Sequence, residues 1–170
     1  MIALKPIPTT MAAVVLHGHG DLDQLVFHPD WPTPRPDPGE VLIEVGACGL
    51  NNTDVNTRIA WYSRGVTEGT TGTALAKARG EDGTWGGHSI AFPRIQGADV
   101  AGTVVALGEG VDGQLLGRRV LVDPWLRDWD DPFEGDKCGY YGSEWDGGFA
   151  QYTVAPMPCV HPIASEASDA

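Results

Sequence analysis

A dense group of hydrogen-bonding side chains lies in the stretch from residue 47 to residue 62. Its polar and aromatic members, within a few positions of one another, are Asn51, Asn52, Asp54, Asn56, Arg58, Trp61 and Tyr62. Amides, carboxylates, guanidinium groups and phenols can hold a polar substrate by hydrogen bonds. A mere connector would not need so many of them, so we expect this stretch to form the rim of an active site.

Composition narrows the class of protein that carries this stretch. The chain has 170 residues, enough for one domain with a single core. Its 23 Gly and 13 Pro predict many turns and short strands, and therefore a barrel or sandwich rather than a helical bundle. The formal net charge of −12 argues against nucleic acid or an anionic membrane as a partner.

The cysteines and the apolar runs indicate the compartment. Cys48, Cys138 and Cys159 are odd in number and widely spaced, which is typical of reduced thiols. The apolar runs are far shorter than the ~20 residues that cross a bilayer, and the first residues lack the apolar core of a signal peptide. We therefore expect a cytoplasmic protein.

Alternating hydrophobicity predicts the strands that must position the polar stretch. The clearest strand covers residues 40–45, where Val41, Ile43 and Val45 share one face and Leu42 and Glu44 the other, as in a half-buried strand. Further strands are expected at 12–16, 25–28, 103–107, 118–123 and 149–154. Residues 29–38 contain five prolines and should form a stiff connector.

Four other segments lack such a pattern. Residues 1–10 are interpreted as a loose leader and residues 163–170 as a truncated linker. Residues 63–89 form a long Gly- and Thr-rich insert, with a helical turn at 74–79, that is either a functional lid or flexible. Residues 124–144 form an acidic, aromatic lobe without the spacing of a calcium loop, and we expect its aromatic rings to fold inward.

Six motifs occur in a telling order. They are Pro-Gly-Glu-Val-Leu-Ile-Glu-Val at 38–45, Gly-Leu-Asn-x-x-Asp-x-x-x-Arg at 49–58, Gly-x-Asp-x-Ala-Gly at 97–102, Val-Ala-Leu-Gly-Glu-Gly-Val at 105–111, Gly-Arg-Arg-Val at 117–120 and Gly-Gly-Phe-Ala-Gln-Tyr at 147–152. Together they resemble the N-terminal, GroES-like domain of medium-chain dehydrogenases/reductases. The resemblance covers residues 11–162 and implies a partly open β-barrel.

The resemblance also implies a missing half. In that family the barrel is one wall of a cleft, and a Rossmann domain that holds NAD(P) is the other. This chain has no strand followed by Gly-x-Gly-x-x-Gly and a helix, so NADP(H) or NAD(H) would bind only with a Rossmann domain in the same or another chain. A half-protein that exposes its former domain interface could also form a homo-oligomer.

The residue types at the family's zinc-ligand positions indicate whether this chain could bind zinc. The zinc-dependent branch has Cys and His where this chain has Asn51 and Ala98, and neither residue supplies a thiolate or an imidazole. Cys48 lies three residues before Asn51 and is expected to pack as a small apolar group. Of the four cysteines of the family's structural zinc only Cys138 is found, so no zinc is expected.

The Gly-Leu-Asn pattern with later Asp, Arg and Tyr instead resembles the zinc-free branch, which includes quinone oxidoreductases and enone reductases. This implies a domain that orients a small molecule, such as a quinone, an activated alkene or a carbonyl compound, for hydride transfer. The implied catalytic residues are Asn51, as donor to the developing oxyanion, and Tyr62, as donor or proton source. Asn52, Asp54 and Trp61 are the implied substrate contacts, and the insert at 63–89 would shape substrate choice as a lid.

Simpler roles compete with these. Asn51 could cap a short helix that starts near Thr53, and Trp61 and Tyr62 could simply pack. Asp54 and Arg58 are four residues apart and could form a helical ion pair of ~0.3–0.5 kcal/mol. Arg58, Gly97 and Asp99 are interpreted as structural residues near the cleft. Two other functions also remain: an alcohol dehydrogenase with atypical zinc ligands such as His88, Cys48 or Asp99, and a non-catalytic association module.

Overall fold

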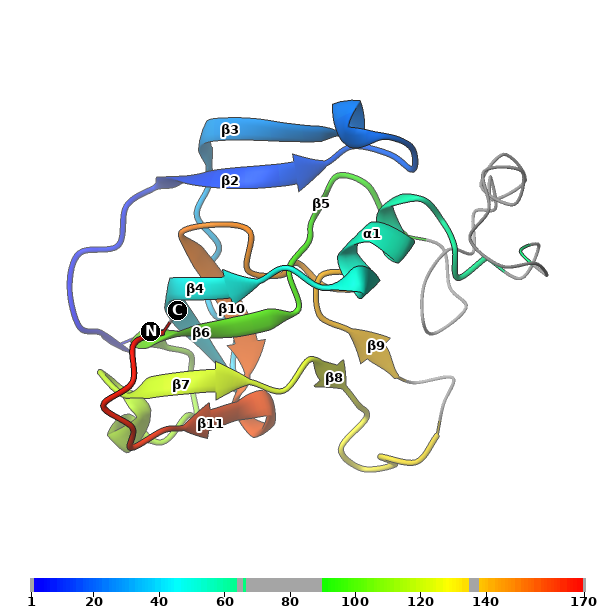
Figure 1. Ribbon diagram of the computed structural model, residues 1–170. Helices are drawn as coiled ribbons and strands as arrows, with labels where there is room; N and C mark the ends of the chain where they lie inside the picture. The colour runs from blue at the N-terminus through cyan, green and yellow to red at the C-terminus, as the bar shows by residue number, and fades with distance from the viewer. Residues whose placement is uncertain (1, 64–65, 67–89, 135–137, 170) are drawn as a thin grey trace.

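Strands dominate the computed structural model, which describes residues 2–63, 66, 90–134 and 138–169 (Figure 1). They form one six-stranded, one three-stranded and one two-stranded sheet. The described part of the chain has a single α-helix, α1 (Asn52–Arg58), and no helix there is long and apolar enough to cross a membrane. The expected mainly β partial barrel is confirmed.

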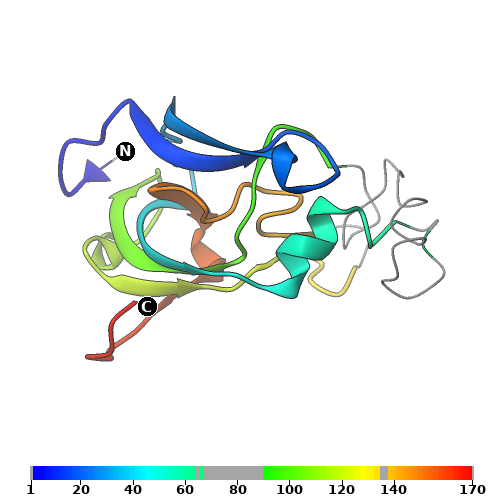
Figure 2. The ribbon, with the colours of Figure 1, turned by 45° about the horizontal axis from the view of Figure 1, so that its top comes forward.

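The polar stretch at 47–62 begins on the second strand of the six-stranded sheet and continues beyond its end. Its antiparallel order is β10-β4-β6-β7-β11, with β1 added on β6. The strands are β1 (Ile2–Ala3), β4 (Glu40–Gly49), β6 (Asp99–Leu107), β7 (Arg119–Val122), β10 (Tyr152–Pro156) and β11 (Val160–Pro162). Two register shifts interrupt the β4–β6 pairing. Such irregularities increase local twist, and β4 and β6 curve strongly in Figure 2.

The three-stranded sheet lies across the six-stranded one (Figures 1 and 2). Its order is β3 (Leu25–Pro32), β2 (Thr10–Leu16), β5 (Arg94–Ile95). The two-stranded sheet pairs β8 (Trp125–Leu126) with β9 (Gly139–Tyr140). Among the residues that the structure describes, 3-10 turns occur at η1 (Leu22–Gln24), η2 (Gly113–Leu115) and η4 (Met157–Cys159). β3 continues through Pro29 and Pro32, beyond the strand expected at 25–28, because an edge strand tolerates proline.

Strand β4 separates two apolar clusters. Val41 and Ile43 belong to the larger cluster, together with residues of β6 and β7, whereas Leu42 belongs to the cluster under the three-stranded sheet. The expected assignment of these side chains to two faces is therefore right. The expectation of a half-buried strand is wrong here, because Leu42 is as fully buried as its neighbours. The second sheet covers the face that the sequence left to solvent.

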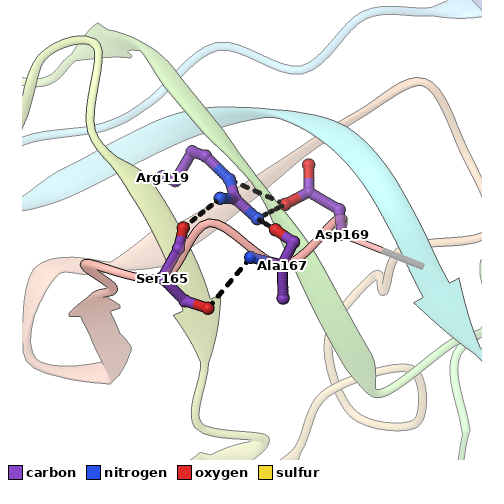
Figure 3. A network of polar contacts seen from close by, with 4 residues as sticks. All are labelled: Arg119, Ser165, Ala167 and Asp169. Carbon is purple, nitrogen blue, oxygen red and sulfur yellow. Dashed lines mark hydrogen bonds and ion pairs between the residues drawn. The ribbon is translucent and has the colours of Figure 1, made fainter.

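Both ends of the chain fold onto the sheet. Ile2 pairs with Leu107, and the Lys5 ammonium lies 2.7 Å from a carboxylate oxygen of Glu44, so residues 1–10 are not simply loose. At the other end the Arg119 guanidinium donates to the carbonyl oxygens of Ser165 and Ala167 and to the Asp169 carboxylate (Figure 3). A two-residue strand and a single arginine leave no periodic pattern, which explains why the sequence suggested loose termini.

The acidic lobe only partly matches the expectation. Tyr141 is fully buried, and its hydroxyl lies 2.6 Å from Thr153 Oγ1 and donates to the Val154 carbonyl oxygen. Phe133, however, is 97% exposed and Trp129 is 44% exposed, so the prediction that the aromatic rings fold inward is wrong for these two. The helical turn at 74–79 and nearly all of the 63–89 insert lie outside the described residues.

Candidate functional site

Asn51 begins the helix that follows strand β4. Its backbone is extended, with φ −128° and ψ 158°, and its side-chain oxygen accepts from the Thr53 N–H at 3.4 Å. Asp54 accepts in return from the Asn51 N–H at 2.9 Å, which completes a capping box. The predicted cap is thereby confirmed. The amide of Asn51 also donates to Asp99 Oδ2 at 3.0 Å, so the helix start is tied to the first residue of β6.

Asp54 joins α1 to the segment before β6. It is 7% exposed, and its Oδ1 accepts from the Gly97 N–H at 3.1 Å, while the Gln96 amide donates to its backbone oxygen at 2.9 Å. Burial raises the pKa of Asp54, two backbone N–H groups lower it, and nearby Asp99 raises it. The expected ion pair with Arg58 is not among the ion pairs of the described residues. Arg58 instead donates to the Gly20 carbonyl oxygen.

Gly97 lies where three distant segments meet. Its N–H bonds Asp54, and its carbonyl oxygen accepts from the Gly148 N–H at 2.8 Å. Its φ is +97°, and a Cβ there would lie 2.6 Å from Cys48 Sγ and from Phe149 Cδ1. Only glycine suits this conformation and this close approach. The motifs at 97–102 and 147–152 therefore pack directly on each other beneath the helix start.

Cys48 packs in this junction. Its side chain lies against the larger core cluster. Burial, followed by the charges of Asp54 and Asp99, raises the pKa of its thiol to about 12. A thiol with such a pKa remains protonated at neutral pH, and the thiolate is the form that reacts or binds metal. Packing is thus the role that the geometry supports.

Tyr62 folds back over the helix. Its hydroxyl lies 3.0 Å from Thr53 Oγ1 and accepts from the Asn56 amide at 3.3 Å. The Trp61 ring meets the Tyr62 ring edge to face, with centroids 5.4 Å apart. The fold therefore brings the two predicted catalytic residues to one helix, with Asn51 at its start and Tyr62 just beyond its end. Asn52 is exposed on the first turn.

Tyr140 is a neighbour that the sequence reasoning missed. Burial raises the pKa of the Tyr140 phenol most, and the charges of Asp99, Tyr62 and Asp54 raise it further. The phenol therefore lies near these three residues. Its ring meets Trp125 edge to face at 5.2 Å. The signal was the density of aromatic and acidic residues at 124–144, which was interpreted as a lobe with its aromatic rings folded inward.

An open cavity of about 310 Å³ lies beside Gly49 and Asp99, next to the start of α1. It is lined by Ala47, Gly49, Asp99, Val100, Ala101, Leu121, Val122 and Asp169. Small side chains and backbone make up most of its wall, and Asp99 and Asp169 supply its charge. The cavity thus extends from the helix start to the C-terminal segment that Arg119 holds.

The donor groups at the site do not match a zinc centre. Asn51 offers an amide that is already hydrogen-bonded, and Ala98 is fully buried. Zinc sites use thiolate, imidazole and carboxylate donors. Within residues 2–63, 66, 90–134 and 138–169 no three His, Cys, Asp or Glu side chains are grouped to hold a metal. His88, an atypical ligand considered above, lies outside these residues.

The curled six-stranded sheet, with a short capped helix at the end of β4, has the architecture of a GroES-like partial barrel. Residues 37–165 match the alcohol dehydrogenase GroES-like domain, and the chain belongs to this family. The resemblance to the GroES-like domain is thereby confirmed. The finer assignment to a quinone oxidoreductase branch is not established by this match.

The known proteins that resemble this chain are longer dehydrogenases. A solved structure from Sinorhizobium meliloti 1021, assigned as an alcohol dehydrogenase, superposes with TM-score 0.74 at 41% identity over 96% of this chain and 42% of its own. The NAD-dependent alcohol dehydrogenase of Sulfolobus acidocaldarius is 27% identical over 86% of this chain and 38% of its length. L-threonine 3-dehydrogenase of Pyrococcus horikoshii is 31% identical over 72% and 31%. The chain thus spans under half the length of these relatives.

Proposed function

We propose that this chain is the substrate-side catalytic domain of an NAD(P)H-dependent oxidoreductase that reduces a quinone, an activated alkene or a carbonyl compound without zinc. Membership of the alcohol dehydrogenase family supports the class of reaction. The observation that carries the metal-free part is the position of Asn51, an exposed amide that caps α1 and bonds Asp99 where a metal-dependent relative is expected to have a cysteine.

Asn51 can supply an oxyanion donor. An amide nitrogen carries two hydrogens, and Asp99 accepts one of them, which fixes the plane of the amide. The other hydrogen can point to the substrate oxygen on which negative charge develops. A preorganised donor of this kind accelerates a reaction by about 100- to 1000-fold. The nicotinamide would supply the hydride when bound by the second domain.

Tyr62 can supply the proton that completes the reduction. Its hydroxyl accepts from the Asn56 amide and lies 3.0 Å from Thr53 Oγ1, two contacts that hold the phenol oxygen beside the first turn of α1. A phenol is protonated at neutral pH and can donate without a change of charge before the reaction. Asn52 and Trp61 remain candidates for substrate contacts. Asp54, with both oxygens bonded inside the protein, fits a positioning role.

The proposal includes a Rossmann domain as partner, in the same chain or another. The relatives named above are more than twice as long as the matched part, which supports this partner. A homo-oligomer and a cytoplasmic location are further parts of the proposal. All three cysteines are free thiols, in keeping with such a location.

The test joins residues 1–170 to the nucleotide-binding domain of the Sinorhizobium relative and follows oxidation of NADH and NADPH with quinones, enones and ketones. Asn51→Ser keeps an oxygen for the helix cap but removes the amide donor. It should lower kcat by about 100-fold with little change in Tm. Gln114→Ser, which removes an exposed amide on η2, between β6 and β7, is the control. An unchanged kcat in Asn51→Ser would overturn the role of Asn51.

A zinc arm separates the proposal from a metal-dependent enzyme. One solved relative, a thermostable alcohol dehydrogenase from Pyrobaculum aerophilum at 27% identity and TM-score 0.66, is cobalt and zinc bound. Activity of the joined protein should survive a chelator, and an Asn51→Cys, Ala98→His variant is the positive control for zinc uptake. Activity restored only by added zinc would overturn the metal-free reaction. Absence of hydride transfer with every substrate would favour a non-catalytic association module.

A further inference from the structure

The cavity beside Gly49 and Asp99 has one wall that does not belong to the six-stranded sheet. Of the residues that line it, two lie on β4, three on β6 and two on β7, and the remaining one is Asp169. Asp169 belongs to residues 163–169, which follow β11 without forming a helix or strand and which we call the strap. The strap thus supplies a part of the cavity wall that can move while the sheet stays in place.

Arg119, on β7, holds the strap through four hydrogen bonds (Figure 3). Its Nε and Nη2 atoms donate to Asp169 Oδ1 at 3.0 and 2.6 Å. Its Nη1 and Nη2 atoms donate to the carbonyl oxygens of Ser165 and Ala167 at 2.7 and 2.6 Å. A guanidinium group is a rigid fork of N–H donors, so this one side chain fixes both the path of the strap and the position of its carboxylate.

Gly46, on β4, leaves room for the same carboxylate. A Cβ at this position would overlap the Asp169 side chain, and the three atoms nearest to it all belong to Asp169. Gly46 is not among the glycines with positive φ, so an added methyl group would strain only this contact. Since β6 lies between β7 and β4, the strap crosses β6 on its way from Arg119 to Gly46.

The strap is attached mainly by polar groups that water reaches. Residues 164–168 are exposed, and the side chains of Arg119 and Asp169 are 32% and 23% exposed. Salt weakens an ion pair of this kind. Segments that bury little apolar surface open locally at a small part of the free energy of global unfolding. The strap can therefore open while the barrel remains folded.

We propose that the strap is a movable wall of this cavity, held closed by Arg119, and that its release widens the entrance beside Asp99. With the strap open, the cavity becomes an uncovered face of β4, β6 and β7. One consequence rests on the proposed function: because Asp99 orients the Asn51 amide, an open strap would admit a larger substrate to the candidate site.

The first test measures how often the strap opens. A protease specific for glutamyl bonds cleaves after Glu166 at a rate that follows the open population of the strap. Arg119→Gln removes the four hydrogen bonds and Gly46→Ala displaces the Asp169 carboxylate, so each should raise the cleavage rate at this bond by about fivefold or more. The matched control is Arg127→Gln, because Arg127 forms an ion pair with Asp123 of similar exposure, 30% and 29%.

The second test follows the cavity itself. Ala101 lines the cavity and is 7% exposed, so Ala101→Cys introduces a thiol that reports how freely a maleimide reagent enters. Adding Arg119→Gln or Gly46→Ala should raise its alkylation rate by about fivefold or more, as peptide mass spectrometry would measure. A rise in NaCl to about 0.5 M should speed alkylation while Arg119 is present, and not in Arg119→Gln.

The outcomes decide between a movable wall and a passive tail. Faster cleavage and faster alkylation in both strap variants, with Arg127→Gln unchanged, support the movable wall. Wild-type rates in either folded strap variant overturn it, and faster cleavage without faster alkylation shows that the strap does not close the cavity. Circular dichroism and Tm check that each variant keeps the fold. Neither readout measures hydride transfer, so both results are independent of the proposed reaction.

Discussion

Replacement of Asp54 by asparagine should destabilise the barrel because one backbone N–H loses its acceptor. The two carboxylate oxygens accept from the Asn51 and Gly97 N–H groups at 2.9 and 3.1 Å, in a residue that is only 7% exposed. Asparagine has one oxygen and one NH₂ group, so a donor then faces a donor. The loss of a hydrogen bond to a charged group costs ~1.5–3 kcal/mol. Relief of the buried charge offsets part of it, and we expect a net loss of about 2 kcal/mol.

The assay is urea and thermal unfolding of the purified protein. For a chain of this size, ~2 kcal/mol corresponds to a fall in Tm of about 4–8 °C. The matched control is Asp112→Asn, because Asp112 is an exposed cap that accepts from the Gln114 N–H at 2.9 Å. Asparagine and aspartate cap equally well, so the control should change Tm by at most a degree or two. Equal shifts in the two variants would refute the reasoning.

The pH dependence of the same variant tests the sign of the Asp54 titration. Burial, the largest effect, places the pKa of the folded-state carboxyl above its ordinary value of 3.8. The folded protein then binds the proton before the unfolded chain does. The stability that this titration adds is present below 3.8 and is lost as pH rises through the raised pKa. The difference in the free energy of unfolding between wild type and Asp54→Asn should therefore increase on acidification. A difference that decreases would show that the two N–H bonds dominate the pKa instead.

Two further predictions concern the junction beneath the helix. Gly97→Ala should lower the free energy of unfolding by more than about 3 kcal/mol, because a left-handed backbone already costs ~1–2 kcal/mol and the new methyl group meets Cys48. The control is Gly39→Ala, at φ +82° with open space around it. It should lower the free energy of unfolding by only about 1–2 kcal/mol in the same urea titration. Cys48, whose pKa is raised to about 12, should be alkylated by iodoacetamide at pH 8 at least tenfold more slowly in the folded protein than in urea, as peptide mass spectrometry would measure. Equal rates in both conditions would contradict its burial.

The sequence predicted the fold well where local pattern and tertiary structure agree. The alternation of hydrophobic residues identified residues 40–45 as a strand and assigned Val41 and Leu42 to opposite faces. In the structure β4 directs these two side chains into different apolar clusters. Asn favours the cap position of a helix, which made Asn51 a candidate cap, and the structure confirms that cap; the reciprocal bond of Asp54, which completes a capping box, was not predicted. Both results depend on residues close together in the sequence, so no long-range contact is needed to predict them.

The rest of the site depends on contacts that no local pattern contains. Asp54 was paired with Arg58 because the spacing suited a helix, but the carboxylate turned to the backbone of Gly97, 43 residues away. Arg58 is itself buried, at 8% exposed, and its guanidinium donates to the Gly20 carbonyl oxygen instead. Tyr140 was missed for the same reason, since it lies far from Asp99 in the sequence and only the folded chain brings the two together.

The junction at Gly97 also sets an order of events during synthesis. The Gly97 carbonyl oxygen accepts from Gly148, and the Gln96 carbonyl oxygen accepts from the Phe149 N–H at 2.9 Å. A ribosome that adds ~5–20 residues per second needs roughly 3–10 s to proceed from residue 97 to residue 149. Until then the carbonyl oxygens of Gln96 and Gly97 lack these backbone donors. The nascent barrel therefore stays open on this side for seconds, and it is during this interval that a chaperone would have most to protect.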